Sequence, residues 1–94
     1  MYDVYILKLH NKKLYIGYTN DLKKRIVEHQ TGMSVHTKKF LPCKLIYYEA
    51  FASRKDAIKR EKNIKKFKGS YRQLKLRIAS SIFDTKEGMT LLYE

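Results

Sequence analysis

Two residues that could bind or position an anionic group share a helix face that the sequence pattern assigns to the core. On a helix that begins near Leu22, Ile26 lies about 40° to one side of Leu22 and His29 about 20° to the other, at 100° per residue. Arg25 lies beside this apolar stripe, four residues before His29, so both side chains occupy one face. A guanidinium can bind a phosphate through its planar fork, and an imidazole can exchange a proton near neutral pH.

A carboxylate occupies a similar place on a second expected helix. With Ala57 as the reference direction, Ile64 lies at about −20° and Glu61 at about +40°, in the middle of the apolar face. An unpaired buried carboxylate costs several kcal/mol, so Glu61 needs a partner. That partner is either a cation of the chain, namely Arg25 or a neighbouring lysine, or a divalent metal ion, for which a carboxylate oxygen is a suitable ligand.

Two tyrosines lie in neighbouring segments that are typical of strands. Tyr5 belongs to the first segment, and Tyr15 shares one face of the second with Gly17, which we expect to leave open space beside it. A free tyrosine titrates near pH 10, so it could serve as a base only with positive charge nearby. The chain has eight tyrosines, so simple packing is the alternative role for both.

The elements that position these residues alternate between strands and helices. Residues 4–9 and 14–19 are rich in β-branched and aromatic residues and predict a hairpin across the polar segment 10–13. Asn20 is expected to cap a helix that has Asp21 in its first turn and Gly32 just past its end. Residues 33–43 are expected to form a loop, and residues 44–51 a third strand.

Two further helices are predicted after the third strand. Ser53 with Asp56 resembles a capping box and opens a helix to about residue 68, and Ser70 with Gln73 opens another to about residue 81. The order β-β-α-β-α-α indicates an α/β (α+β) fold with a small three-stranded antiparallel sheet and flanking helices. We expect one domain over residues 1–81, with residues 82–94 as a C-terminal extension of uncertain structure.

Composition narrows the class of protein. The chain has 94 residues, and its 21 Lys and Arg against 9 Asp and Glu give a formal net charge of +12, which favours polyanionic partners. The single cysteine, Cys43, excludes an internal disulfide, and it forms no metal-ligand pattern with the three scattered histidines. We see no apolar run long enough to span a membrane and no signal peptide, and we expect a cytoplasmic protein.

The tyrosine, arginine, histidine and glutamate positions occur in an order that resembles the GIY-YIG nuclease family. Val4-Tyr5-Ile6 and Tyr15-Ile16-Gly17 resemble its two name-giving motifs, and Arg25, His29 and Glu61 follow in the family's order. The resemblance covers about residues 2–78. It is greatest to small stand-alone bacterial members, and the family also includes the incision domain of bacterial excision repair.

This resemblance implies metal-assisted hydrolysis of a phosphodiester bond, with selectivity for the structure of the nucleic acid. Glu61 would hold one Mg²⁺ or Mn²⁺ ion, and Arg25 would bind the scissile phosphate. Tyr15 would orient or deprotonate the attacking water, with Tyr5 and His29 assisting. A single carboxylate suits Mg²⁺, which keeps several waters and takes other ligands from the substrate.

Secondary positions of the expected site are Gly17, Tyr18 and Gln73. Tyr18 stands where several active members carry a lysine, and Gln73 stands where the repair nuclease has an asparagine. The alternative function is therefore a non-catalytic nucleic-acid-binding module with a vestigial site. An RNA-associated binding protein and an anionic-membrane binder are further alternatives, which the inward-facing charged residues and the lack of an aromatic-rich helix face disfavour.

Positive charge is concentrated in residues 53–78, which hold eleven Lys and Arg against two acidic residues. Such a surface would contact the phosphate backbone, which gives affinity without sequence selectivity. We expect DNA rather than RNA as the partner. The residues expected to bind nucleic acid are Lys24, Lys38, Lys39, Arg60, Lys65, Lys68 and Arg72.

Overall fold

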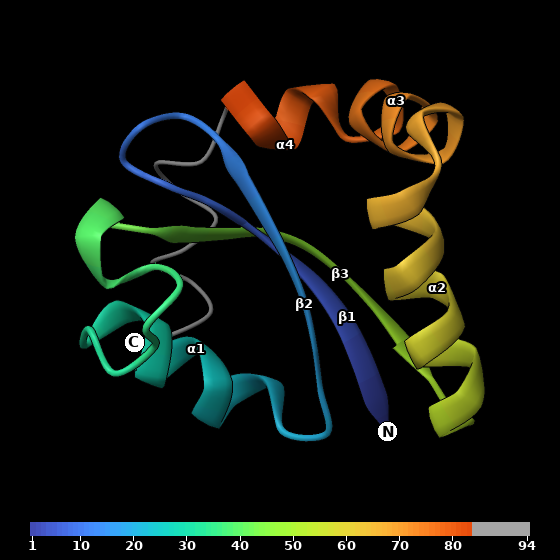
Figure 1. The fold of residues 1–94 in the computed structure, drawn as a ribbon, viewed down its shortest axis with the longest axis horizontal. Coiled ribbons are helices and arrows are strands. Elements are labelled where there is room, and N and C mark those ends of the chain that lie inside the picture. Colours follow the sequence, from blue (N-terminus) through green and yellow to red (C-terminus); the bar gives the residue numbers. More distant parts are fainter. Residues whose placement is uncertain (84–94) are drawn as a thin grey trace.

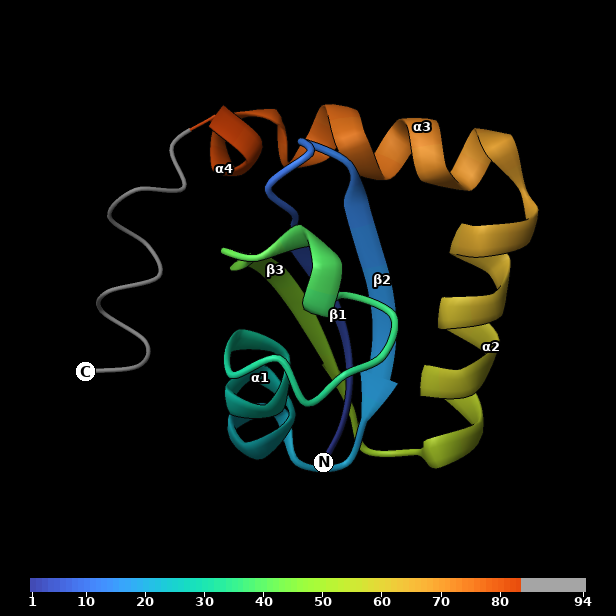
Figure 2. The same ribbon diagram turned by 60° about the vertical axis from the view of Figure 1, so that its left-hand side comes forward.

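The computed structural model describes residues 1–83, in which helices cover both faces of a small sheet (Figure 1). The elements are β1 (Tyr2–Lys8), β2 (Leu14–Thr19), α1 (Leu22–Gln30), the 3-10 helix η1 (Lys38–Phe40), β3 (Lys44–Phe51), α2 (Arg54–Lys66), α3 (Lys68–Arg77) and α4 (Ala79–Phe83). α1 lies on one side of the sheet, and α2 and α3 lie on the other side (Figure 2). The predicted fold class is confirmed, with η1 and α4 as additions.

The sheet is antiparallel and has the order β2-β1-β3, so β1 is its central strand. Both faces of β1 are covered, and each side chain from Val4 to Leu7 is at most 1% exposed. A strand that is buried on both faces has a continuous apolar run instead of an alternating pattern, which explains the sequence of β1. β2 and β3 are the two edges of this sheet.

Successive side chains of β1 enter two separate cores. Val4 and Ile6 contribute to the core under α2 and α3, which includes Ala57 and Ile64. The core under α1 consists of Tyr5, Leu7, Leu9, Ile26, Cys43 and Leu45, with Cys43 as a buried free thiol. Full burial of one large aliphatic side chain stabilises a fold by about 1.5–3 kcal/mol, so these two cores hold the three layers together.

The beginning of α1 differs from the prediction by one residue. Asp21, not Asn20, is the N-cap residue, and its carboxylate accepts a hydrogen bond from the backbone N–H of Lys24 at 3.2 Å. Asp21 is itself held by the Thr19 hydroxyl, which accepts from the Asp21 N–H at 3.0 Å. Gly32 follows the helix as predicted, with a φ of +80° that favours glycine.

The helices after β3 are divided differently from the prediction. Ser53 precedes α2, but its side chain makes no capping hydrogen bond. The extended backbone of Phe67 ends α2 and precedes α3, so Ser70 lies inside α3 and the predicted capping box there is wrong. Leu74 and Ile78 are buried against the sheet, and this packing places the start of α3 before Ser70.

The expected boundary between the domain and its extension falls within α4. This helix ends at Phe83, and residues 84–94, which make up most of the expected extension, lie outside the described residues. Among residues 1–83, no helix combines the length and the apolar character that crossing a membrane requires.

An ion pair joins α2 to the sheet on the side away from α1. The Arg60 guanidinium donates from Nε and Nη2 to the two carboxylate oxygens of Glu49, each at 2.9 Å, and the Tyr47 hydroxyl donates to the same carboxylate at 2.7 Å. Burial opposes ionisation of Glu49, but the hydrogen bonds from Arg60 and Tyr47 outweigh it and lower the pKa. The guanidinium expected to contact nucleic acid is thus engaged within the fold.

Gly17 lies directly beneath the ring of Tyr5, its partner in the β1–β2 pairing. A Cβ atom at position 17 would overlap the Cζ and Oη atoms of Tyr5. The expected open space beside Tyr15 is therefore filled by Tyr5, and glycine is needed because another buried ring crosses the backbone here.

We expect Gly17→Ala to displace the Tyr5 ring and to lower the free energy of unfolding by about 1–3 kcal/mol, the usual cost of overpacking a core. Urea unfolding, together with NMR spectra of the tyrosine rings, measures both effects. Gly69→Ala is the matched control, because a Cβ atom at that helical position meets nothing within 4 Å. Unchanged stability and unchanged Tyr5 resonances in Gly17→Ala would contradict this packing.

Candidate active site

Four of the five principal site residues meet on the α1 side of the sheet. In the β1–β2 register Tyr5 pairs with Gly17 and Leu7 pairs with Tyr15, so Tyr5 and Tyr15 project from the same face. The ring centres of Tyr5 and Tyr15 are 6.3 Å apart, and those of Tyr15 and His29 are 5.1 Å apart. The helical spacing that put His29 on the apolar face of α1 is confirmed, since His29 is fully buried.

His29 is fixed by hydrogen bonds at both ring nitrogens. Its Nε2 lies 2.8 Å from the Tyr5 hydroxyl, and its Nδ1 lies 2.8 Å from Oγ1 of the buried Thr37. Arg25 also interacts with the Tyr5 hydroxyl, and a guanidinium can only donate, so we assign the Tyr5 O–H as the donor to Nε2. Nδ1–H then donates to Thr37.

The electrostatics of the cluster keep one residue neutral and its neighbour charged. Burial, together with the positive charge of Arg25, lowers the pKa of His29 to about 4. Hydrogen bonding to Tyr5 raises the pKa of Arg25, whose half-exposed guanidinium also pairs with Glu28 at 3.2 Å. Burial raises the pKa of Tyr5 to about 12, although Arg25 opposes this shift. At neutral pH the cluster therefore holds a neutral imidazole, a protonated Tyr5 and a positive Arg25.

Tyr15 is the more accessible of the two tyrosines. It is partly exposed, whereas Tyr5 is 1% exposed. The ring of the exposed His36 stacks on Tyr15, with ring centres 6.3 Å apart and planes at 27°. Thr37 and His36 both come from the loop before η1, and no residue spacing in the sequence indicated that this loop covers the cluster.

Glu61 comes from α2, the helix on the other face of the sheet, and its charge acts on the cluster. Its negative charge contributes to the raised pKa of Tyr5, although burial is the main cause of that shift. Its carboxylate pairs with the ammonium group of Lys65 at 3.5 Å, one helical turn along α2. Of the partners that the sequence left open within the chain, the structure therefore selects a neighbouring lysine, and Arg25 pairs with Glu28 instead.

The oxygen and nitrogen donors near the cluster limit the kinds of metal that could bind. Within residues 1–83, no three His, Cys, Asp or Glu side chains lie close enough together to hold an ion. A site with Glu61 alone fits a hard cation such as Mg²⁺ or Mn²⁺, which can keep waters as its other ligands, and does not fit a structural zinc ion.

The secondary positions are dispersed. Gly17 belongs to the cluster because Tyr5 lies on it. Tyr18 pairs with Val4 on the opposite face, where its hydroxyl accepts a hydrogen bond from Nε of Arg54 at 3.2 Å. Gln73 is exposed on α3 and lines a small cavity of about 120 Å³ near Arg60. The structure does not bring Tyr18 and Gln73 together with Tyr5.

Apart from Arg60, the residues expected to bind nucleic acid are all exposed, and they fall on four elements. Lys24 is on α1, and Lys38 and Lys39 form most of η1. Lys65 is on α2 beside Glu61. Lys68 and Arg72 lie on α3 and line a groove with Lys12, Lys13 and Lys75.

Comparisons with known proteins place the chain in a family. A family model for the GIY-YIG catalytic domain matches residues 1–76. The chain is 41% identical over 78 residues to a UPF0213 protein of Staphylococcus saprophyticus, which covers 82% of this chain and 92% of that protein. It is 43% identical over 79 residues to a UPF0213 protein of Clostridium perfringens, and this match covers 83% of this chain and 82% of that protein.

A solved structure agrees with these sequence matches. The solution NMR structure of a UPF0213 protein from Bacillus halodurans aligns with a TM-score of 0.53 and 28% identity, over 98% of this chain and 95% of that one. The family model, the similar relatives and the solved structure lead to one conclusion. The chain belongs to the GIY-YIG family, among its small UPF0213 proteins.

Proposed function

We propose that this protein is an endonuclease that uses one Mg²⁺ or Mn²⁺ ion to hydrolyse phosphodiester bonds in DNA. Membership of the GIY-YIG family implies a nuclease-like function and a nucleic-acid partner. The observation that carries the proposal is the convergence of Tyr5, Tyr15, Arg25 and His29 on one face of the sheet, with Glu61 close enough to act on Tyr5. The expected cytoplasmic location remains a prediction.

The charges of the site suit a phosphate diester. Arg25 stays positive and is partly exposed, so its guanidinium can donate two hydrogen bonds to the phosphate oxygens. Glu61 would hold the divalent ion, which would polarise the phosphate and stabilise the leaving oxygen. To bind the ion, Glu61 must release the ammonium group of Lys65. The two groups are 3.5 Å apart and partly exposed, so breaking this ion pair costs little free energy.

The two tyrosines would have different tasks. Tyr15 is accessible and close enough to Arg25 for their charges to interact, so the guanidinium would stabilise negative charge that develops on its oxygen. We therefore assign to Tyr15 the orientation and deprotonation of the attacking water. Tyr5 is buried and stays protonated, and its hydroxyl hydrogen-bonds to His29. We therefore assign to Tyr5 the positioning of Arg25 and His29.

A non-catalytic nucleic-acid-binding module is the second candidate. The ion pair between Glu61 and Lys65 favours it, because a carboxylate that is already paired has less need of a metal ion. Such a module would bind through the lysines of the surface and would not depend on Glu61 or on Tyr15.

We expect the purified protein to nick supercoiled plasmid in Mg²⁺ or Mn²⁺ and to be inactive in EDTA. Glu61→Gln and Arg25→Ala should each lower the rate by about 10²–10³, the usual loss when one group that stabilises transition-state charge is removed. Asp56→Asn is the matched control, since it removes an exposed carboxylate from the same helix. Absence of nicking in every metal, with DNA binding intact, would establish the binding module instead.

Removing each tyrosine hydroxyl should separate catalysis from stability. Tyr15→Phe should lower cleavage by about 10²-fold or more and leave the free energy of unfolding nearly unchanged, because that ring is partly exposed. Tyr5→Phe should lower the free energy of unfolding by about 1–3 kcal/mol, since it leaves Nε2 of His29 buried without its donor. Cleavage assays and urea unfolding measure the two effects, and the reverse pattern would exchange the two assignments.

Acid should destabilise the fold through His29. Its pKa is about 4 in the folded protein, below the usual value of about 6.5, so the unfolded chain binds more protons between these values. The stabilisation is complete above pH 6.5 and is lost as the pH falls to about 4, by up to about 3 kcal/mol.

An NMR titration of the His29 ring and urea unfolding at several pH values test this prediction. The ring resonances should stay constant from pH 7 to about pH 5. His29→Gln, which has no group that titrates in this range, should lose this part of the pH dependence. A midpoint near 6.5 for His29 would contradict the neutral, buried imidazole.

A further inference from the structure

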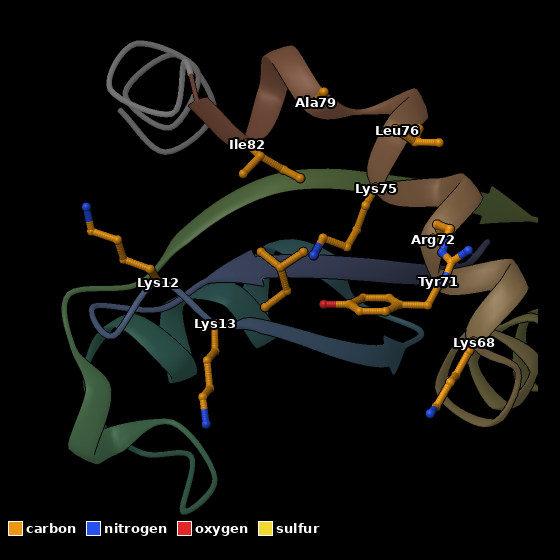
Figure 3. Close-up of a pocket in the computed structure, with 10 residues that line it drawn as sticks. Lys12, Lys13, Lys68, Tyr71, Arg72, Lys75, Leu76, Ala79 and Ile82 are labelled. Carbon is orange, nitrogen blue, oxygen red and sulfur yellow. The ribbon is translucent and has the colours of Figure 1, made fainter.

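A groove of about 940 Å³ lies on the side of the sheet away from α1, between the β1–β2 hairpin and the helices α3 and α4 (Figure 3). Its cationic side chains come from both sides. It is lined by Lys12, Lys13, Leu14, Lys68, Tyr71, Arg72, Lys75, Leu76, Ala79 and Ile82. None of the residues Tyr5, Tyr15, Arg25, His29 and Glu61 belongs to this lining.

Five of the ten lining residues are cations, and none is acidic. Within residues 1–83, none of these five side chains pairs with a carboxylate, unlike Arg25, Arg60 and Lys65. Unpaired cations that face one another across a groove repel each other, so they lower the affinity of the groove for cations and raise it for a polyanion. A nucleic-acid backbone is the polyanion that fits the charge of this chain.

The floor of the groove is apolar. The ring of Tyr71 points into the space between α3 and the hairpin, and the ammonium of Lys75 lies 5.3 Å from its centre (Figure 3). Leu76 is 73% exposed at the rim, and Leu14 and Ile82 complete the surface. A groove that only bound phosphates would gain nothing from these apolar side chains, whereas an unpaired base can pack on an aromatic ring and on the apolar surface beside it.

The groove is joined to the candidate active site across one strand. Leu14 lines the groove, and its neighbour Tyr15 belongs to the site on the opposite face of the sheet. β2 is an edge strand, so no further strand separates the two faces at this point. A flexible chain that leaves the groove over this edge therefore reaches the face that carries Tyr15 without crossing another strand.

We propose that this groove binds a single-stranded segment of the nucleic acid whose phosphodiester is cleaved at the site. Its cations contact successive phosphates, and a base packs on Tyr71 and Leu76. A duplex has its bases stacked inside and presents only its backbone to such a groove, so the apolar floor selects unpaired strands. Cleavage of the bound strand rests on the proposed function, whereas binding in the groove does not.

The hairpin tip adds a variant that separates binding from folding. Lys12 has a φ of +70°, a left-handed backbone conformation that residues other than glycine, asparagine and aspartate seldom adopt. Lys12→Gly removes one groove cation and relieves this strain. Weaker binding by that variant at unchanged stability is then an effect of the lost charge.

Fluorescence anisotropy in EDTA, where metal-dependent cleavage does not occur, measures the binding of labelled single strands and duplexes of about 20 nucleotides. The groove variant Lys68→Gln/Arg72→Gln/Lys75→Gln is compared with Lys23→Gln/Lys55→Gln/Lys59→Gln, which loses the same charge from exposed positions outside the groove. We expect the groove variant to bind single strands about tenfold or more weakly than the control variant, and its salt slope to fall by about 2. Lys12→Gly should bind single strands more weakly with no loss of stability.

Leu76→Gln should lower affinity for single strands by about threefold or more and leave the salt slope and duplex binding unchanged. Equal losses in the two triple variants, or duplexes bound more tightly than single strands, would overturn the proposal. A chain that fails to bind strands but forms dimers with increasing concentration would assign the groove to a second copy and also overturn it. Groove-dependent binding without nicking in any metal would support the groove and reject the nuclease.

Discussion

The packing of Tyr5 on Gly17 is the constraint on which the candidate site depends. The ring leaves the central strand, crosses the backbone of β2 where no side chain intervenes, and donates its hydroxyl proton to His29. This one side chain is a member of the core under α1 and a member of the site. Its burial fixes the distance between the sheet and α1, and that distance in turn places Arg25 and His29 beside Tyr15.

The contrast between Arg25 and His29 sets the charge of the site. The two residues are one helical turn apart, and a positive imidazole beside the guanidinium would repel it. Burial and the charge of Arg25 keep His29 neutral, so it orients Tyr5 without competing for the negative charge of a substrate. The resulting positive charge belongs to a planar group that is half-exposed and already held by Tyr5 and Glu28.

Much of the fold could be predicted because it depends on local patterns, whereas contacts between distant segments could not. The β-branched and aromatic residues of the segment 4–9 indicated a strand, and helical spacing placed the α1 residues on one face. Ser70 has a capping pattern, yet burial of residues further along α3 decided where that helix begins. Thr37 reaches His29 through a loop with no periodic pattern, and the partner of Glu61 depends on side-chain geometry that spacing leaves open.

The site alone offers a phosphate diester little binding energy. Arg25 would attract it, Glu61 would repel it, and Tyr5 and His29 are neutral and buried. Interactions remote from the reacting atoms can supply the energy that holds a substrate in place. The sheet order permits this, because β2 at its edge carries Tyr15 on one face and Leu14 on the other, and five cations line the same groove as Leu14. The groove that binds the nucleic acid and the site that cleaves it would then lie on opposite faces of β2. A strand held in the groove would pass over the edge of β2 to reach the site.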